Sequence, residues 1–304
     1  MSQASASNAS PEFQRGLIVT IATFFAWGLF PLYWRELAVV PSFQITAHRI
    51  TWCAVFVVAF LIWRDGLGWL RRSLAPPRAL PLLMVSSVLI SINWVLYIWA
   101  VNAGNVVETA LGYYINPLIN VLIGVLVLRE KLNARQWIAV SIAAAGVAWL
   151  TWGVGRFPWI ALTLATSFAF YGLIRKQVSV ESVPGLGVES LIMFLPSLGF
   201  LIWCEQIGEG SFGHVDLYKN TLLIGAGIAT ALPLIGFAYG ARRIPLSLVG
   251  IVQYLGPTLQ LLIGVFLFGE AFSQDRAIGF GLIWLALALY AFDGVWRLRI
   301  RGYG

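Results

Sequence analysis

The chain has 304 residues, of which 59% are hydrophobic and 11% are charged, and it carries a formal net charge of +7. Because soluble domains contain about 25% charged residues, this composition excludes an ordinary soluble domain and indicates a membrane protein. Two cysteines and two histidines are too few for a disulfide framework or the common metal centres, so we predict no metal and no cofactor.

Residues 1–14 are polar and rich in small side chains, and we expect a flexible tail there, without the basic segment of a secretory signal. After this tail, apolar stretches recur at about the 20-residue length that crosses the hydrocarbon core of a membrane. The loops between them are too short to hold a soluble domain. We therefore predict an all-α, polytopic membrane protein with ten transmembrane helices, roughly at residues 16–34, 43–64, 79–100, 105–128, 135–152, 157–174, 187–204, 219–240, 246–268 and 277–296.

The distribution of Lys and Arg predicts how these spans are oriented, because positive charge collects on the cytoplasmic side of a membrane protein. Of the 20 Lys and Arg, Arg49 lies inside a span, and four lie on the side opposite to the N-terminus, namely Arg35, Arg156, Lys219 and Arg276. The remaining 15 lie on the N-terminal side. We therefore expect both termini in the cytoplasm, and the net charge requires no nucleic-acid partner to explain it.

The chain repeats itself. The segments YINPLINVLIGVLVLRE (114–130) and YLGPTLQLLIGVFLFGE (254–270) share a tyrosine, a proline, an LIGV run and a final glutamate in one register, and FLIW recurs at 60–63 and 200–203. Each copy holds five spans, and because five is an odd number the second copy enters the membrane from the opposite side.

Many secondary transporters are built from such inverted repeats, with the substrate site near the membrane midplane between the halves. A duplicated bundle without a transport role is the alternative. We expect the first five-helix repeat at residues 15–152, the second at 153–297 and a cytoplasmic C-terminal tail at 298–304.

The repeated segments also carry a resemblance to a known family. The stretches at residues 97–147 and 237–272 resemble the two EamA-type repeats of the drug/metabolite transporter superfamily. Three shorter segments are similar to its RarD branch: TAHRITW (46–52), LGYYINPLIN (111–120) and SFAFYGLIRK (167–176). The resemblance implies a multi-pass permease of the bacterial inner (plasma) membrane, with ten helices in the lipid bilayer around a central cavity and no enzymatic activity.

Relatives of this fold such as the YddG-type proteins export amino acids. We therefore expect a secondary transporter that exports small amphiphilic metabolites, above all bulky aromatic or apolar amino acids, by alternating access. A drug or other metabolite permease of the same fold and a gated channel or sensor are the alternatives. An intramembrane enzyme would need a catalytic cluster, and the sequence offers none. The partners expected are the small-molecule substrate and the bilayer, for a monomer or a homodimer.

A polar stripe around each repeated proline marks the expected substrate path. Tyr113 and Asn116 share a helical face with Asn120, and the corresponding residues of the second copy include Gln253 and Gln260. Because an unpaired amide in hydrocarbon is costly, these side chains should face a cavity or bond to a neighbouring helix. The candidate substrate-binding residues are aromatic or amide side chains in apolar spans: Trp27, Asn93, Trp94, Tyr97, Tyr113, Asn116, Phe170, Tyr171, Gln253 and Tyr254. Pro117 and Pro257 are expected to act as hinges beside the cavity, packing kinks being the alternative.

Arg49 places a fixed positive charge inside an apolar span. Its long side chain could extend outward to the membrane surface, which is the simpler interpretation. The functional interpretation requires a partner, and we expect Arg49 to pair with Glu108 or with freed backbone carbonyls. The residue corresponding to Arg49 in the second repeat is Glu189, which we expect to pair with Arg242 or Arg243. The two pairs would then act as gates at opposite faces.

Three further features have ordinary explanations. His48 is expected to be a hydrogen-bonded structural histidine, with titration near neutral pH as the alternative. Glu130 and Glu270 are expected to cap helices or anchor loops. The match of GEGSFG (208–213) to a glycine-rich nucleotide motif lies in a loop and is taken as chance, and no Walker A sequence occurs.

Overall fold

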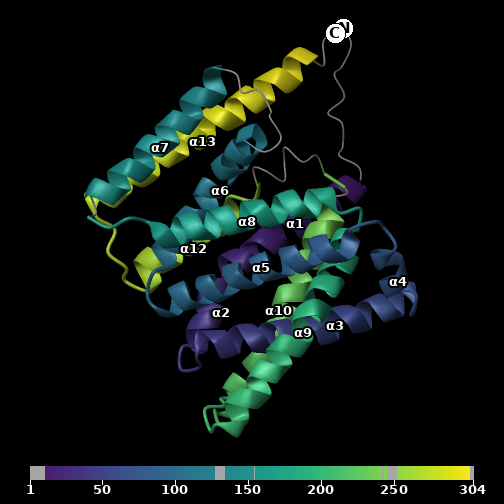
Figure 1. Ribbon diagram of the computed structural model, residues 1–304. Coiled ribbons are helices and arrows are strands. Elements are labelled where there is room, and N and C mark those ends of the chain that lie inside the picture. The colour runs from purple at the N-terminus through teal and green to yellow at the C-terminus, as the bar shows by residue number, and fades with distance from the viewer. Residues whose placement is uncertain (1–10, 127–133, 154, 242, 245–251, 302–304) are drawn as a thin grey trace.

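The computed structural model describes residues 11–126, 134–153, 155–241, 243–244 and 252–301, and every regular element in these ranges is a helix (Figure 1). The helices pack into one bundle, with α7 and α13 paired along one edge. The elements are α1 (Pro11–Gly28), α2 (Phe30–Glu36), α3 (Ser42–Asp65), α4 (Trp69–Leu74), α5 (Ala79–Asn102), α6 (Val106–Leu126), α7 (Ala134–Gly153), α8 (Trp159–Gln177), α9 (Ser182–Gln206), α10 (Leu217–Ala241), α12 (Leu255–Leu262), the π-helix η1 (Ile263–Leu267) and α13 (Gln274–Arg301).

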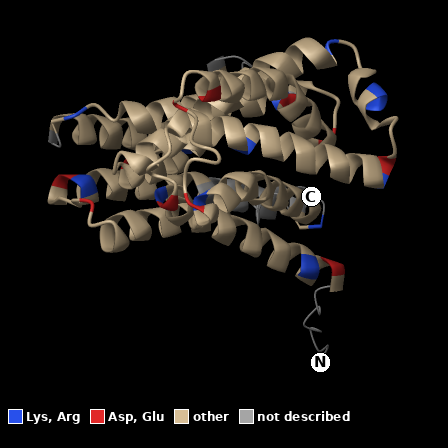
Figure 2. Cartoon of the chain, turned by 90° about the horizontal axis from the view of Figure 1, so that it is seen from below, with Lys and Arg blue, Asp and Glu red and all other residues tan. Residues whose placement is uncertain are grey.

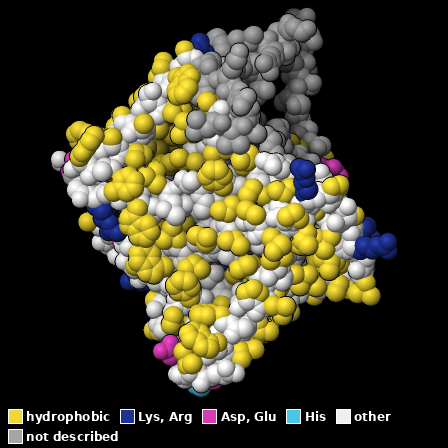
Figure 3. All heavy atoms as spheres, viewed as in Figure 1, with side chains coloured by type: hydrophobic (Ala, Val, Ile, Leu, Met, Phe, Trp, Pro, Cys, Tyr) yellow, Lys and Arg dark blue, Asp and Glu magenta, His cyan; other side chains and the backbone are white. Residues whose placement is uncertain are grey.

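The helices have the length and the surface of membrane spans. Hydrophobic side chains are spread over the described part of the face shown in Figure 3, with few charged ones among them, and long stretches of helix carry no charged residue in Figure 2. Two shorter apolar helices span Trp159–Arg175 and Leu255–Leu267. Within the described residues, five helical stretches are long and apolar enough to cross a membrane: Pro11–Glu36, Ser42–Asp65, Ala79–Asn102, Ser182–Gln206 and Leu217–Phe237. The all-α membrane-protein class is thus confirmed.

The helix boundaries depart from the predicted spans in places. The seventh predicted span begins at residue 187, whereas α9 begins at Ser182. Proline is tolerated in the first turn of a helix, so the sequence SVPG opens α9, although it has the composition of a loop. The short helix α4 lies between predicted spans. The start of the ninth predicted span, at 246, falls outside the described residues, and η1 ends that span at Leu267.

The two halves of the chain use their helices in the same way. Helix α1 packs against α10 and α12, and α8, the corresponding helix of the second half, packs against α5 and α6. The pairs α3 with α9 and α7 with α13 are contacts between equivalent helices. The repeat seen in the sequence is therefore also a repeat in packing, in which the first helix of each half packs against helices of the other half.

The first predicted span is divided at Gly28–Leu29 into α1 and α2. Pro31 has no N–H, so the carbonyl of Trp27, four residues earlier, loses its usual helical donor. The side-chain amide of Gln260 in α12 donates to this carbonyl, with an Nε2 to O distance of 3.2 Å. Gly28 permits the approach, because an added Cβ there would lie 2.7 Å from the Leu259 side chain. The break in the first span is thus closed by a residue of the second repeat.

Gly227 sets the spacing between α10 and α3. A Cβ added at this position would lie 2.6 Å from the backbone nitrogen of Cys53, and backbone cannot move aside as a side chain can. We expect Gly227→Ala to lower the melting temperature of the purified protein, because overpacking costs about 1–3 kcal/mol. Gly199→Ala is the matched control, since nothing lies within 4 Å of its added Cβ and alanine favours helix. Equal melting temperatures for the two variants would contradict this close contact.

Candidate functional site

Arg49 lies on α3 and is buried inside the bundle, with 5% of its surface exposed. Its Nε donates to Thr230 Oγ1 of α10 at 2.8 Å. The guanidinium carbon lies 4.0 Å from the ring centre of Trp94 and 5.2 Å from that of Trp34, which is within cation–π range. The side chain therefore does not extend to the membrane surface, and its immediate neighbours are one hydroxyl and aromatic rings.

No carboxylate forms an ion pair with Arg49 in the described part of the chain, so the predicted pair with Glu108 is wrong. Glu108 Oε1 instead accepts a hydrogen bond from the backbone N–H of Ile160, at 3.0 Å. This places the carboxylate at the N-terminus of α8, where free backbone donors and the helix dipole favour negative charge. Glu108 and Arg49 face different helices, and Arg49 is a buried cation without an acidic partner among the described residues.

Two tyrosines complete the surroundings of Arg49. Tyr97 and Tyr113 pack edge to face with ring centres 5.9 Å apart, and both lie within electrostatic range of the guanidinium. The Tyr97 hydroxyl is buried, and no described group hydrogen-bonds it. Three of the predicted substrate-binding residues, Trp94, Tyr97 and Tyr113, are thus brought together around one positive charge.

The predicted amides bind neighbouring helices. Asn93 Nδ2 donates to the carbonyl of Leu164 at 3.0 Å and to Ser167 Oγ at 2.9 Å. Asn116 Nδ2 donates to the carbonyl of Ala165 at 3.0 Å. Both amides thereby attach their helices, α5 and α6, to α8, which is the alternative raised from the sequence. Their contact with a substrate stays a prediction.

The two proline-centred segments meet each other. Tyr114 and Tyr254, which correspond in the repeat, stack with ring centres 6.1 Å apart and an interplanar angle of 14°. The Tyr114 hydroxyl is hydrogen-bonded to Thr258 Oγ1 at 2.6 Å. Pro117 lies inside α6, whereas Pro257 lies in the first turn of α12, where its missing N–H breaks no helical bond. Their role as hinges stays a prediction.

The remaining predicted residues are spread around this centre. Trp27 packs against Phe237 with ring centres 6.0 Å apart. The Gln253 side chain is half-buried. Phe170 is 40% exposed, and its neighbour Tyr171 donates its hydroxyl to a carboxylate oxygen of Glu189 at 3.2 Å.

Glu189 is the centre of a buried polar cluster on α9. Besides Tyr171, it accepts a hydrogen bond from Ser86 Oγ of α5 at 2.5 Å. Its carboxylate lies 3.7 Å from Nε of Arg175, at the end of α8. Arg175 is therefore its ion-pair partner, and the predicted pairing with Arg243 is wrong; Arg242 lies outside the described residues.

Arg175 reaches Glu189 because it lies across the first turn of α9. Its Nη2 donates to the carbonyls of Glu181 and Ser182, at 3.3 and 3.4 Å. The guanidinium occupies the space that a side chain on Gly185 would take. The cluster therefore connects α5, α8 and α9 through one buried carboxylate.

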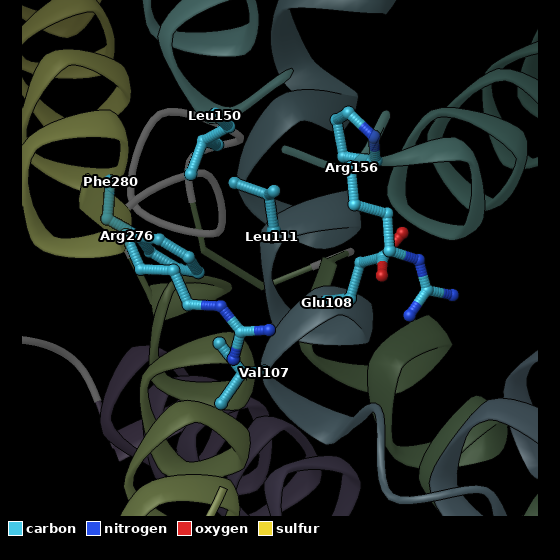
Figure 4. A pocket seen from close by; sticks show the side chains of 8 residues that line it. Val107, Glu108, Leu111, Leu150, Arg156, Arg276 and Phe280 are labelled. Atoms are coloured by element: carbon cyan, nitrogen blue, oxygen red, sulfur yellow. The ribbon is translucent and has the colours of Figure 1, made fainter. Parts of the chain in front are cut away.

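A small pocket of about 40 Å³ lies beside Glu108, lined also by Arg156 and Arg276 (Figure 4). This volume suits a few waters and is too small for a metabolite. Close by, Glu270 accepts the backbone N–H groups of Val106 and Val107, at 2.6 and 2.9 Å, so it caps α6 as expected. Burial raises the pKa of the Glu270 carboxyl, and these two hydrogen bonds act in the opposite direction. Glu130, the equivalent residue, lies outside the described residues.

Four residues of these clusters were not among the predicted site residues: Trp34, Ser86, Arg175 and Thr230. Ser86, which is followed by Ser87, and Thr230 are hydroxyl residues in apolar spans, and such residues often form contacts between membrane helices, so this signal could have singled them out. Arg175 has the appearance of an ordinary positive charge at the end of a span. Only the turn that leads from α8 into α9, whose carbonyls Arg175 binds, shows that its side chain reaches Glu189.

Comparisons with known proteins agree with this architecture. The EamA-like transporter family matches residues 14–152 and again residues 158–292. A solved crystal structure superimposes with a TM-score of 0.59 over 91% of this chain and 96% of that one, at 21% identity, which is a likeness of fold.

Three relatives match nearly end to end. The uncharacterized transporter YojE of Bacillus subtilis is 46% identical, covering 94% of this chain and 97% of the relative. Protein RarD of Escherichia coli K12 is 38% identical over 95% and 97%. The chloramphenicol-sensitive protein RarD of Pseudomonas aeruginosa is 30% identical over 94% and 96%. With two copies of the family domain and relatives along its whole length, the chain belongs to the EamA-like transporter family as a RarD-type permease.

Proposed function

We propose that this transporter exports small amphiphilic metabolites that carry a carboxylate, above all bulky aromatic or apolar amino acids. The observation that carries the proposal is the Arg49 site, a buried guanidinium without an acidic partner in the described chain. A buried charge is costly unless it is paired, and such charges inside membrane proteins mark substrate or ion pathways. A substrate carboxylate supplies the missing partner, because it matches the planar fork of arginine.

The aromatic rings around Arg49 suit the rest of such a substrate. Their apolar faces suit a bulky substrate side chain, and their π surfaces suit the ammonium group of an amino acid. The rings are those of Trp34, Trp94, Tyr97 and Tyr113. The unpartnered Tyr97 hydroxyl adds a hydrogen-bonding group that the substrate can use. The proposal therefore assigns the carboxylate to Arg49 and the side chain to the aromatic wall.

We place this site between two inverted repeats of five membrane helices each, in the bacterial inner membrane, with both termini in the cytoplasm. The distribution of Lys and Arg supports the orientation, and the exchange of packing partners between the halves supports the inversion. Alternating access then follows from one half rocking against the other around the site.

A drug permease is the second candidate, because one relative is named for sensitivity to chloramphenicol and aromatic walls suit drugs as well. A gated channel or sensor would show neither saturation nor counterflow.

Counterflow into proteoliposomes tests the proposal. We expect saturable counterflow of L-phenylalanine or L-leucine and at least about tenfold slower counterflow of phenethylamine, which lacks the carboxylate; tenfold corresponds to about 1.4 kcal/mol. Vesicles without protein are the control. Saturable counterflow of neutral drugs with none of any amino acid would contradict the carboxylate assignment and favour the drug permease.

A further inference from the structure

A pocket of about 310 Å³ lies between α3 and α9, apart from the Arg49 site. One wall is a single face of α3, with His48, Thr51 and Trp52. The other wall is the facing side of α9, with Leu198 and Leu201. The loop that follows α9 closes one end. His48 and Arg49 are neighbours in sequence but point to different helices, so one helix serves two separate sites.

The α3 wall carries three buried polar atoms without a hydrogen-bond partner in the described chain: His48 Nε2, Thr51 Oγ1 and Trp52 Nε1. His48 and Thr51 are only 5% and 8% exposed. The expectation of a hydrogen-bonded structural histidine is therefore not met at Nε2. Leaving such a group unsatisfied costs about 1–3 kcal/mol, and three on one face of one helix indicate that something else binds there.

The loop that closes the pocket is held by hydrogen bonds to α3. Gln44 binds the closing loop at two points: its Nε2 donates to the carbonyl of Glu209 at 2.7 Å, and its Oε1 accepts the N–H of Ser211 at 2.9 Å. The Phe212 ring lies against His48 with ring centres 5.1 Å apart. The roof is thus held in place without a ligand.

The groups that line the pocket fit an amphiphilic ligand better than they fit water. Each water in such a pocket would need two to four polar partners, whereas the α9 wall, apart from Glu205, is leucine and isoleucine. The charged lining residue, Glu205, has one carboxylate oxygen 2.8 Å from His214 Nε2, and its side chain is 55% exposed at the rim of the pocket. Trp52 Nε1 can only donate, so the ligand must bring an acceptor oxygen.

We propose that this pocket binds a small neutral amphiphile, with its apolar body against α9 and a hydroxyl or carbonyl oxygen on the His48–Thr51–Trp52 wall. The site is distinct from the Arg49 site and does not depend on what is transported.

Binding of 2-phenylethanol to the full-length protein in phosphatidylcholine nanodiscs tests the proposal, with ethylbenzene as the probe that lacks the oxygen. We expect saturable binding of the alcohol, measured by saturation-transfer NMR and thermal shift, and at least about tenfold weaker binding of ethylbenzene. Leu201→Trp fills the pocket and should abolish binding. Leu195→Trp, on the same helix but 73% exposed, should leave it unchanged.

Thr51→Val is the second test of ligand binding, for the case that Leu201→Trp does not fold. It removes an unpartnered buried hydroxyl, so it should weaken 2-phenylethanol binding about fivefold without lowering the melting temperature. Arg49→Gln should leave binding intact, which separates this site from the proposed transport site. Equal binding of both probes, or binding unchanged by Leu201→Trp and by Thr51→Val, would overturn the proposal.

Discussion

Arg49→Gln should reduce amino-acid counterflow about 100-fold while the protein stays folded. Truncating a buried, hydrogen-bonded charge partner costs about 2–5 kcal/mol, and each 1.4 kcal/mol is a factor of ten. Without substrate, the Arg49 guanidinium forms no ion pair with a described carboxylate, so the substitution breaks none. Because a buried charge is itself costly, removing it should leave the melting temperature unchanged or raise it. Glutamine keeps a donor for Thr230. Initial rates in proteoliposomes and melting curves in detergent measure the two effects.

Arg49→Lys refines this result. Lysine keeps the charge but loses the planar fork that matches a carboxylate, so we expect an intermediate loss of about tenfold. Arg71→Gln, an exposed arginine on α4, controls for loss of charge in general. Wild-type rates for Arg49→Gln would remove the main support for a carboxylate-bearing substrate.

Glu189→Ala should destabilise the folded protein by about 3–5 kcal/mol, the loss typical of a broken buried ion pair. The change would leave the Arg175 guanidinium without its counter-charge and leave the hydroxyls of Ser86 and Tyr171 without their acceptor. Thermal or denaturant unfolding of the purified protein measures the loss.

Glu205→Ala is the matched control, because Glu205 lies on the same helix and its contact with His214 is largely exposed. The double variant Glu189→Ala/Arg175→Ala should lose less than the sum of the single variants, since the two residues interact directly. A loss for Glu189→Ala no larger than that for Glu205→Ala would show that the cluster does not hold α5, α8 and α9 together.

Helices and the repeat could be predicted from sequence because both leave a local signal. Apolar length identifies a span wherever the neighbouring helices lie. The shared register of the repeat predicted that Tyr114 and Tyr254 hold equivalent places, and the structure stacks them on each other. The start of α9 was missed because proline and glycine have the composition of a loop even where they open a helix.

The partners of buried charges could not be predicted in the same way. Counting residues along a helix estimates depth, and depth made Glu108 a reasonable partner for Arg49. It says nothing of rotation about the helix axis, and Glu108 faces α8. Likewise the sequence paired Glu189 with Arg243, whereas Arg175 at the end of α8 reaches it across the first turn of α9.

The divided first span has a consequence for how the protein is made. The Trp27 carbonyl is bonded by Gln260, which lies 233 residues further along the chain. During synthesis the opening helix therefore enters the membrane before this donor has been made. The N-terminal half does not supply the donor itself, and a single five-helix copy would need a second copy to supply it.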